Sequence, residues 1–356
     1  MSKKKVLIAM SGGVDSSVAA YLLKSRGYDL TAAMMKLYAD SHTDKQGRCC
    51  SLTDANDARD VAASLDIPFH VFNFTERFTA DVIERFVREY QNGRTPNPCI
   101  DCNRYLKFGR FIRRAAELDA HYIATGHYAR ISVEPSGRFL LKTGVDASKD
   151  QSYVLYAMTQ GELSKTLFPL GGYTKEEIRA IAEEQGFVNA KKPDSQDICF
   201  AADGDYAGFI ERFTGAKSKK GRFITKDDQT LGEHKGLIYY TVGQRKGLGL
   251  YGPKPLYVTK LDSCANTVTV GESGELLGKS LYARDINLIA APKLDEPLKV
   301  HAKLRYSHKA APAIVHRTGE DEIRVEFQTH QRAITPGQAV VLYDGDIVVG
   351  GGTIRT

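Results

Sequence analysis

The first half of the chain alternates short apolar runs with longer amphipathic stretches. Four of the runs are bounded by polar or glycine positions, and we expect strands over 6–10, 30–37, 69–74 and 121–125. Apolar residues at helical spacing between the runs predict helices over 14–26, around 55–65, around 78–86 and over 103–118. This alternation predicts an α/β fold with a doubly wound, mostly parallel sheet, which binds ligands at the carboxyl ends of its strands.

The pattern changes after residue 202. From residue 256 onward, short runs of alternating polarity predict strands, and Asp344-Gly345 is a typical hairpin turn between the last two. This end of the chain is expected to form a small β-barrel. The stretch before it holds the basic, glycine-containing segment 217–222 and a glycine-rich segment, 241–252. We therefore expect three domains, over residues 1–202, 203–280 and 281–356.

Composition narrows the class of protein. The 356 residues are 42% hydrophobic and 26% charged, as in a folded globular protein. A net charge of +6 permits an acidic partner such as RNA without requiring one. The apolar run near the N-terminus is too short for a signal peptide, and no run is long enough to cross a membrane. Six cysteines are too few for a disulfide scaffold. We expect a cytoplasmic protein without a membrane partner.

A candidate anion-binding loop, Ser11-Gly12-Gly13-Val14-Asp15-Ser16-Ser17, joins the first predicted strand to the first helix. Its glycines let backbone N–H groups approach an anion, the helix N-terminus adds positive potential, and the serines add hydroxyl donors. Asp15 would repel a phosphate unless a cation lay between them, which implies Mg²⁺ at Asp15. The loop lacks the Gly-Lys-Ser/Thr ending of a Walker A motif and is not the G-x-G-x-x-G of a dinucleotide fold.

Three cysteines lie in suggestive contexts. Cys99 and Cys102 form a C-x-x-C that follows two prolines and begins a predicted helix, a position that lowers a thiol pKa. Cys199 lies far along the chain, in the segment 192–200. Three such thiols could carry a persulfide, form a disulfide, or hold a metal or iron–sulfur cluster. No second C-x-x-C completes a zinc site, and Cys49, Cys50 and Cys264 belong to no motif.

The loop at residues 11–17 is similar to that of the PP-loop ATP pyrophosphatases, which cleave ATP between its α and β phosphates. Nearly the whole chain resembles the tRNA-specific 2-thiouridylases, through the loop and through residues 95–108, 124–130, 149–156, 192–200, 243–249 and 335–338. The resemblance implies a PP-loop domain, a central linker or RNA-binding domain and a C-terminal barrel. It implies that ATP adenylates the C2 oxygen of the wobble uridine and that sulfur then displaces AMP, giving 2-thiouridine.

The resemblance also implies residue roles. ATP would be contacted by Ala9, Met10, Ser11, Gly12, Gly13, Val14, Asp15, Ser16, Met35 and Gly126. Cys199 would carry sulfur as a persulfide, delivered by a cysteine desulfurase or a relay protein, and Cys102 would attack it and end in a disulfide with Cys199. Asn97, Pro98 and Cys99 would approach the target base. The tRNA, by family one for Lys, Glu or Gln, would be contacted by His127, Lys149, Asp150, Gln151, Arg305, Tyr306 and Gln338.

One position departs from the family. Some members carry an aspartate, proposed as the activating group, where this chain has Cys99. Either Cys99 takes part in the sulfur chemistry, or Asp101 or water moves the proton. Alternatively, Cys99, Cys102 and Cys199 ligate an oxygen-sensitive iron–sulfur cluster. The persulfide route ranks ahead of the cluster.

Two other functions compete. A PP-loop ligase or amidotransferase that adenylates a small metabolite would need neither the distant cysteines nor the terminal barrel. An RNA-binding chaperone with an inactive nucleotide loop would not need the complete serine and glycine run at residues 11–17.

Overall fold

The computed structural model describes residues 3–38, 52–194, 198–201, 204–251 and 253–355. By its internal contacts the chain divides into two compact units. The first comprises residues 1–82, 99–202 and 346–348, and the second comprises residues 83–98, 203–345 and 349–356. This division by contacts does not test the three domain ranges expected from the sequence, which stay a prediction.

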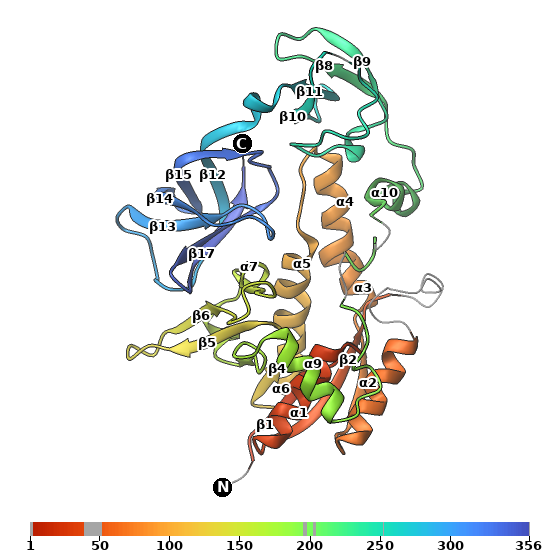
Figure 1. Ribbon diagram of the computed structural model, residues 1–356, viewed down its shortest axis with the longest axis vertical. Coiled ribbons are helices and arrows are strands. Elements are labelled where there is room, and N and C mark those ends of the chain that lie inside the picture. The colour runs from red at the N-terminus through yellow and green to blue at the C-terminus, as the bar shows by residue number, and fades with distance from the viewer. Residues whose placement is uncertain (1–2, 39–51, 195–197, 202–203, 252, 356) are drawn as a thin grey trace. The chain divides into compact units, whose positions relative to one another are not determined.

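The first unit is built on a five-stranded parallel sheet in the order β3-β2-β1-β4-β7, of which Figure 1 labels β1, β2 and β4. Its strands are β1 (Lys5–Ala9), β2 (Asp29–Lys36), β3 (Phe69–Asn73), β4 (Tyr122–Ala124) and β7 (Thr166–Leu167). The four strands predicted from apolar runs and their parallel arrangement are confirmed. The two-residue β7 was not predicted, because a run so short has no periodicity to detect.

Three helices cover one face of this sheet: α1 (Val14–Ser25), α2 (Leu52–Ser64) and α9 (Lys175–Glu184). Their apolar faces share a single buried cluster with the sheet, which includes Ile8, Val18, Ala62 and Ile178. Helix α9 begins with a capping box in which Thr174 Oγ1 accepts from the backbone N–H of Glu177 and the Glu177 carboxylate accepts from the N–H of Thr174. This capping box fixes the residue at which α9 begins.

The other helices of the chain are shorter. They are α3 (Thr75–Phe78), the π-helix η2 (Thr79–Ile83), α4 (Glu84–Gln91), α5 (Pro98–Asp101), the π-helix η3 (Cys102–Arg110), α6 (Phe111–Glu117), α7 (Ser152–Leu155) and α8 (Gln160–Leu163). An antiparallel hairpin that the sequence did not predict, β5 (Ala129–Val133) with β6 (Phe139–Thr143), also belongs to the first unit.

The helix predicted over 103–118 is present as η3 and α6, and its first part is wound as π-helix. A Cβ on Gly109 would lie 3.0 Å from the carbonyl oxygen of Arg104, five residues earlier, so glycine leaves room for the wider turn. Arg110 pairs with Asp81, at 3.5 Å.

The second unit contains the predicted C-terminal barrel. Its strands are β12 (Leu277–Leu288), β13 (Leu298–Lys303), β14 (Ala311–Gly319), β15 (Glu322–Arg332), β16 (Ala339–Asp344) and β17 (Ile347–Ile354). They follow the order β12-β15-β14-β13-β16-β17, and β12 pairs with β17 to close the sheet. Buried side chains such as Leu281, Val315 and Leu342 fill the interior. The turn before β17 is made by Gly345 and Asp346, one residue later than predicted.

A four-stranded sheet, in the order β10-β11-β8-β9, also belongs to the second unit. Its elements are α10 (Tyr206–Thr214), β8 (Gly221–Ile224), β9 (Thr230–His234), the 3₁₀ turns η4 (Leu237–Tyr239) and η5 (Ser273–Leu276), β10 (Tyr257–Asp262) and β11 (Thr267–Gly271). The basic segment expected to be a loop therefore runs into β8. Among the described residues, no helix is both long and apolar enough to cross a membrane.

Candidate active site

The loop over residues 11–17 lies at the carboxyl end of β1, the central strand, and leads into α1. Ser16 organises it: Oγ accepts from the N–H of Ser11 at 3.2 Å and donates to the carbonyl oxygen of Gly13 at 3.0 Å. Gly12 has a φ of +76°, and a Cβ there would lie 2.2 Å from the carbonyl oxygen of Asp54. Glycine is therefore required at position 12 both by backbone conformation and by the close approach of α2.

The other predicted ATP contacts gather at the same edge of the sheet. Gly126 follows β4, and a Cβ there would lie 2.9 Å from the backbone of Asp15 and Ser16. Met35 is half-buried near the end of β2, next to β1. Met10 and Val14 are buried, which leaves their backbone rather than their side chains to face a ligand. The carboxyl ends of three adjacent strands thus surround the loop, as expected of a ligand site in a parallel sheet.

Asp15 is held by two donors that the sequence did not single out. The Lys175 ammonium lies 2.7 Å from Asp15 Oδ1, and Tyr128 Oη donates to the same oxygen at 2.7 Å. Burial, reinforced by the negative charge of Asp15, raises the pKa of Tyr128. Lys175 is only 5% exposed although it is the first residue of α9, where the helix dipole disfavours a cation. The signal in the sequence was a lysine directly after an N-cap, a position that the helix dipole makes unfavourable for a cation.

Whether Mg²⁺ binds at Asp15, as the sequence suggested, stays a prediction. The cation beside its carboxylate is the Lys175 ammonium, and a metal ion bound there would have to displace Lys175 and remain next to its charge. Among the described residues, no three His, Cys, Asp or Glu side chains are arranged to hold a metal ion. The iron–sulfur hypothesis for Cys99, Cys102 and Cys199 therefore has no support in the described part of the chain.

The segment that leads to Cys199 is tied to the phosphate loop. Asn189 Nδ2 donates to the carbonyl oxygen of Gly12 at 3.0 Å and to Ser17 Oγ at 2.9 Å. Lys192 Nζ donates to the same carbonyl at 3.3 Å, and it pairs at 2.6 Å with both Asp54 and Asp57 of α2. Burial alone lowers the pKa of Lys192, but its hydrogen bonds to the two carboxylates outweigh burial and raise it.

Asp194 connects the same segment to Asp15. Its carboxylate accepts from Lys149 Nζ at 2.7 Å, from Lys175 Nζ at 2.7 Å and from Arg179 at 3.0 Å. Burial alone raises the pKa of Asp194, and the hydrogen bonds from Lys149 and Lys175 outweigh burial and lower it. Because Lys175 contacts both carboxylates, a single ammonium links the phosphate loop to the residue five positions before Cys199.

The three cysteines all belong to the first unit, which also holds the phosphate loop. Cys99 is exposed in α5, and Cys102 is half-buried at the start of η3. Cys199 is half-buried, and its sulfur lies 2.9 Å from Tyr38 Oη. Asp101, the alternative proton-transfer group, is buried. Cys49 and Cys50 lie outside the described residues.

Comparison with known proteins identifies the family. The model described as the tRNA methyl transferase HUP domain matches residues 4–203, the tRNA methyl transferase PRC-barrel domain matches 207–272, and the aminomethyltransferase beta-barrel domain matches 278–354. The tRNA-specific 2-thiouridylase MnmA of Clostridioides difficile (strain 630) is 51% identical over 354 residues, which cover 99% of this chain and 98% of that protein. The chain belongs to the tRNA-specific 2-thiouridylase family.

A second 2-thiouridylase, from Lachnoclostridium phytofermentans, is also 51% identical, and the match covers 99% of each chain. Among solved structures, a 4-thiouridine synthetase–RNA complex with bound ATP matches with 20% identity and a TM-score of 0.37. That match covers 56% of this chain and 45% of the other. The family membership rests on the full-length relatives.

Several residues at which 2-thiouridylases were expected to contact tRNA have internal partners here. His127 is 7% exposed, its Nδ1 lies 2.7 Å from Thr125 Oγ1, and its ring packs near Phe108 and Phe168. Burial, and then the charge of Lys107, hold the pKa of His127 well below its usual value. This arrangement is typical of a core histidine, so its contact with tRNA stays a prediction.

The neighbouring pair Asp150 and Gln151 also makes contacts within the first unit. Asp150 Oδ1 accepts from the N–H groups of Gly144 and Ser152. Gln151 Oε1 accepts from the N–H of Tyr128, the residue whose hydroxyl contacts Asp15. Through Tyr128, the contact of Gln151 helps to position Asp15 of the phosphate loop. Whether the two residues and Lys149 also contact tRNA stays a prediction.

In the second unit, the barrel loop at residues 335–338 holds the segment that leads to Asn97 and Pro98. Gln338 Nε2 donates to the carbonyl oxygen of Thr95 at 2.8 Å, and the N–H of Thr95 donates to Pro336 at 2.9 Å. Arg305 donates to Thr335 Oγ1 at 2.8 Å and so fixes the same loop. Two of the sequence segments that carry the family resemblance are therefore in direct contact.

Next to Arg305, Tyr306 is 43% exposed, and Lys303 Nζ lies 5.5 Å from the centre of its ring. An exposed aromatic ring beside a cation suits stacking on an unpaired base.

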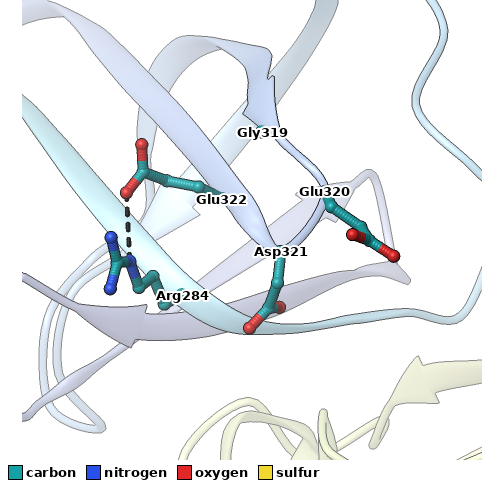
Figure 2. A pocket seen from close by; sticks show the side chains of 5 residues that line it. All are labelled: Arg284, Gly319, Glu320, Asp321 and Glu322. Carbon is teal, nitrogen blue, oxygen red and sulfur yellow. Dashed lines mark hydrogen bonds and ion pairs between the residues drawn. The ribbon is translucent and has the colours of Figure 1, made fainter.

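A cavity of about 290 Å³ on the barrel is a poor nucleotide site (Figure 2). It is lined by Arg284, Gly319, Glu320, Asp321 and Glu322. Glu322 accepts from Arg284 Nε at 3.1 Å, and the Asp321 carboxylate accepts from two backbone N–H groups of β12. The lining carries three carboxylates and one cation, and this excess of negative charge would repel phosphate.

Proposed function

We propose that this chain is an ATP-dependent tRNA 2-thiouridylase. Adenylation activates the C2 oxygen of the wobble uridine, and sulfur carried on Cys199 then replaces that oxygen, giving 2-thiouridine, AMP and pyrophosphate. The observation that carries the proposal is the anchoring of the Cys199 segment to the phosphate loop through Asn189, Lys192 and Asp194. Residues that precede Cys199 in the chain thus contact the nucleotide-binding loop, in the unit that also holds this candidate sulfur carrier.

The reaction needs both halves of this network. The C2 carbonyl of uridine is a weak electrophile with a poor leaving group, and adenylation makes its oxygen leave as AMP. The loop around Ser16 would hold the departing pyrophosphate with backbone N–H groups and the N-terminus of α1. We propose that Mg²⁺ enters as the ATP complex, bound by the phosphates, because Asp15 is held by Lys175.

The sulfur steps use the two partly buried thiols. The Cys199 thiolate would attack the outer sulfur of a persulfide on a cysteine desulfurase or relay protein, and the donor would leave as a thiolate. The outer sulfur of the Cys199 persulfide would attack C2 as AMP leaves. Cys102 would then attack Cys199 Sγ, so that the transferred sulfur stays on the base and a Cys102–Cys199 disulfide forms. A cellular dithiol would reduce this disulfide.

Methyl transfer is the second candidate, since two of the matching family models are described as tRNA methyl transferase domains. Methyl transfer needs a methyl donor and no carrier thiol, whereas this chain places three cysteines in the unit that carries the phosphate loop. Adenylation of a small metabolite would leave the second unit without a role. The residues favour sulfur transfer to RNA over both.

The proposed substrate is the anticodon loop of tRNA for Lys, Glu or Gln. Asn97, Pro98 and Cys99 would approach the flipped base, and the second unit would contact RNA through Arg305, Tyr306 and Gln338. A tRNA substrate also makes the cytoplasm the proposed place of action. We keep residues 1–202, 203–280 and 281–356 as the proposed catalytic, central and barrel domains.

The test is an anaerobic assay for 2-thiouridine, with ATP, unmodified tRNA and a persulfide donor. We expect Cys199→Ser to abolish the persulfide-dependent product and Cys102→Ser to stop turnover, whereas Cys264→Ser, at an exposed turn of the second unit, keeps wild-type activity. AMP should form only when tRNA is present. Full activity of both the Cys102 and Cys199 variants would refute the sulfur assignment, and methylated uridine as product would establish the second candidate.

A further inference from the structure

The sulfur of Cys199 has a hydroxyl group beside it. Tyr38 lies two residues beyond the end of β2, at the same edge of the sheet as Met35, and its Oη is 2.9 Å from Cys199 Sγ. The two residues are 161 positions apart in the chain. Neither periodicity nor motif therefore connects Tyr38 with the sulfur chemistry.

Aromatic packing fixes this contact. Phe78 is fully buried, and its ring meets that of Tyr38 edge-on, with 5.1 Å between centroids and an interplanar angle of 70°. Phe200, the residue after Cys199, packs on the same ring, with 6.0 Å between centroids and an interplanar angle of 71°. Edge-to-face pairs of this kind define ring orientation. One buried ring thus positions both the hydroxyl-bearing side chain and the chain segment that carries the thiol.

The direction of the hydrogen bond follows from acidity. A phenol has an ordinary pKa near 10 and a thiol one near 8.5, so the thiol ionises first and the phenol remains the donor. A hydrogen bond to the charged form of a group lowers its pKa. The Tyr38 hydroxyl therefore favours the thiolate of Cys199, which is the nucleophilic form.

We propose that Tyr38 is a catalytic residue of the sulfur-loading step, in which its hydroxyl donates a hydrogen bond to Cys199 Sγ and stabilises the thiolate. In that step the thiolate attacks the outer sulfur of the donor persulfide. A new S–S bond forms at Cys199, the donor's S–S bond breaks, and the donor leaves as a thiolate. Tyr38 keeps its proton throughout. The assignment rests on the proposed function of Cys199 as sulfur carrier.

Other charged groups lie on the same elements. Lys36 ends β2, and Asp194, on the Cys199 segment, is paired with Lys149, Lys175 and Arg179. All of them are retained when only the hydroxyl is removed. A comparison of tyrosine with phenylalanine at position 38 therefore isolates the hydrogen bond.

The test measures how fast iodoacetamide alkylates Cys199 in the full-length protein, without tRNA, at pH values from 5 to 10. Mass spectrometry of the Cys199 peptide reports the extent of alkylation. In Tyr38→Phe we expect the midpoint of the profile to rise by roughly one to two pH units, and the rate at pH 7 to fall about 10- to 100-fold. Tyr122→Phe is the matched control, because it removes a hydroxyl that accepts from Lys4 at an exposed position of the same unit.

The Cys102 peptide in each sample is an internal reference, and its profile should not move. An unchanged or lower midpoint for Cys199 in Tyr38→Phe overturns the proposal. An equal shift at Cys102 also overturns it, because that result means general loosening of the unit. In Phe78→Leu, which keeps the hydroxyl but removes the ring that orients it, we expect a smaller shift in the same direction, and a shift of opposite sign contradicts the proposal.

A second measurement separates this inference from the proposed function. Transfer of ³⁵S from a persulfide donor to Cys199 should slow in Tyr38→Phe by the same factor as alkylation, with ATP affinity unchanged. If the wild-type protein never thiolates tRNA while the shift at Cys199 is present, the proposed function fails and the effect of Tyr38 on the thiol stands. If thiolation is intact and the shift is absent, the role of Tyr38 fails alone.

Discussion

Lys192 Nζ lies 3.3 Å from the carbonyl oxygen of Gly12, so a side chain from the Cys199 segment contacts the backbone of the phosphate loop directly. The same ammonium is held at 2.6 Å by Asp54 and by Asp57. Through these contacts the start of α2, the glycine turn of the loop and the Cys199 segment share one cation. Any change that alters the loop is therefore expected to reach the segment that carries the thiol.

Replacing Lys192 with methionine tests this link. The change leaves two partly buried carboxylates without their cation, so we expect a loss of about 1–3 kcal/mol in the free energy of unfolding. Affinity for ATP should fall as the loop loses its support, as measured by calorimetric titration. Lys191→Met is the matched control, because Lys191 is its exposed neighbour. Equal stability and ATP affinity in the two variants would show that the Lys192 contacts have no energetic role.

Replacing Gly126 with alanine tests the contact between β4 and the phosphate loop. The added Cβ would lie 2.9 Å from the backbone of Asp15 and Ser16, a distance that backbone atoms must move to relieve. We expect ATP affinity to fall at least about tenfold, which corresponds to about 1.4 kcal/mol. Gly161→Ala is the control, because nothing lies within 4 Å of a Cβ at that exposed position. Wild-type affinity in Gly126→Ala would place the nucleotide elsewhere.

The sequence predicted those parts of the site that depend on local pattern. The loop at residues 11–17 was found because an apolar run marks the strand before it and its glycines mark a close approach of the backbone, whereas Gly126 came from the family resemblance. Tyr38, Asn189 and Lys175 were missed, since their roles come from contacts between segments far apart in the chain. A polar residue that binds a distant loop carries no periodic signal.

The same limit applies to details of the fold and of the loop. The barrel was predicted because alternating polarity over many short strands is a repeated signal. The π-helical turns of η3 were not, because they depend on the room that Gly109 leaves for the carbonyl of Arg104. Magnesium at Asp15 was inferred because the negative charge of its carboxylate, next to a phosphate, needs a cation. The partner in the structure is Lys175, which lies 160 residues away in the chain.

Replacing Asp194 with asparagine removes the carboxylate that three cations share. The pKa of Asp194 is lowered in the folded protein, so its stabilisation is complete above the unfolded pKa, near 4, and is lost as the pH falls through the folded pKa. We expect Asp194→Asn to be about 1–2 kcal/mol less stable than wild type at pH 7, with a difference that shrinks below about pH 4. Urea unfolding at several pH values measures this.

Asp66→Asn is the control for that series. Its side chain is fully exposed and lies 4.0 Å from Lys24, so the exchange should change stability little at any pH. A constant difference between Asp194→Asn and wild type down to pH 3 would mean that ionisation of Asp194 does not cause the effect.

His127 makes the stability of the protein depend on pH through a base rather than through a carboxylic acid. Burial and the nearby charge of Lys107 lower the pKa of His127 in the folded state, so the unfolded chain takes up a proton below about pH 6.5 that the folded chain refuses. Stability is therefore complete above pH 6.5 and falls as the pH drops toward the folded pKa. Uptake of one proton on unfolding changes the slope of the free energy of unfolding against pH by about 1.4 kcal/mol per pH unit.

In His127→Gln the amide retains a partner for Thr125 Oγ1 but takes up no proton in either state, so stability between pH 5 and 6.5 should depend less on pH than in wild type. His70→Gln, an exchange at an exposed histidine of the same unit, should keep the wild-type slope. The same pair of variants decides the predicted RNA contact. If the His127 ring serves only the core, tRNA affinity at pH 7.5 will match wild type in both. A selective loss of tRNA affinity in a stably folded His127→Gln would mean that the ring leaves its buried position to meet the RNA.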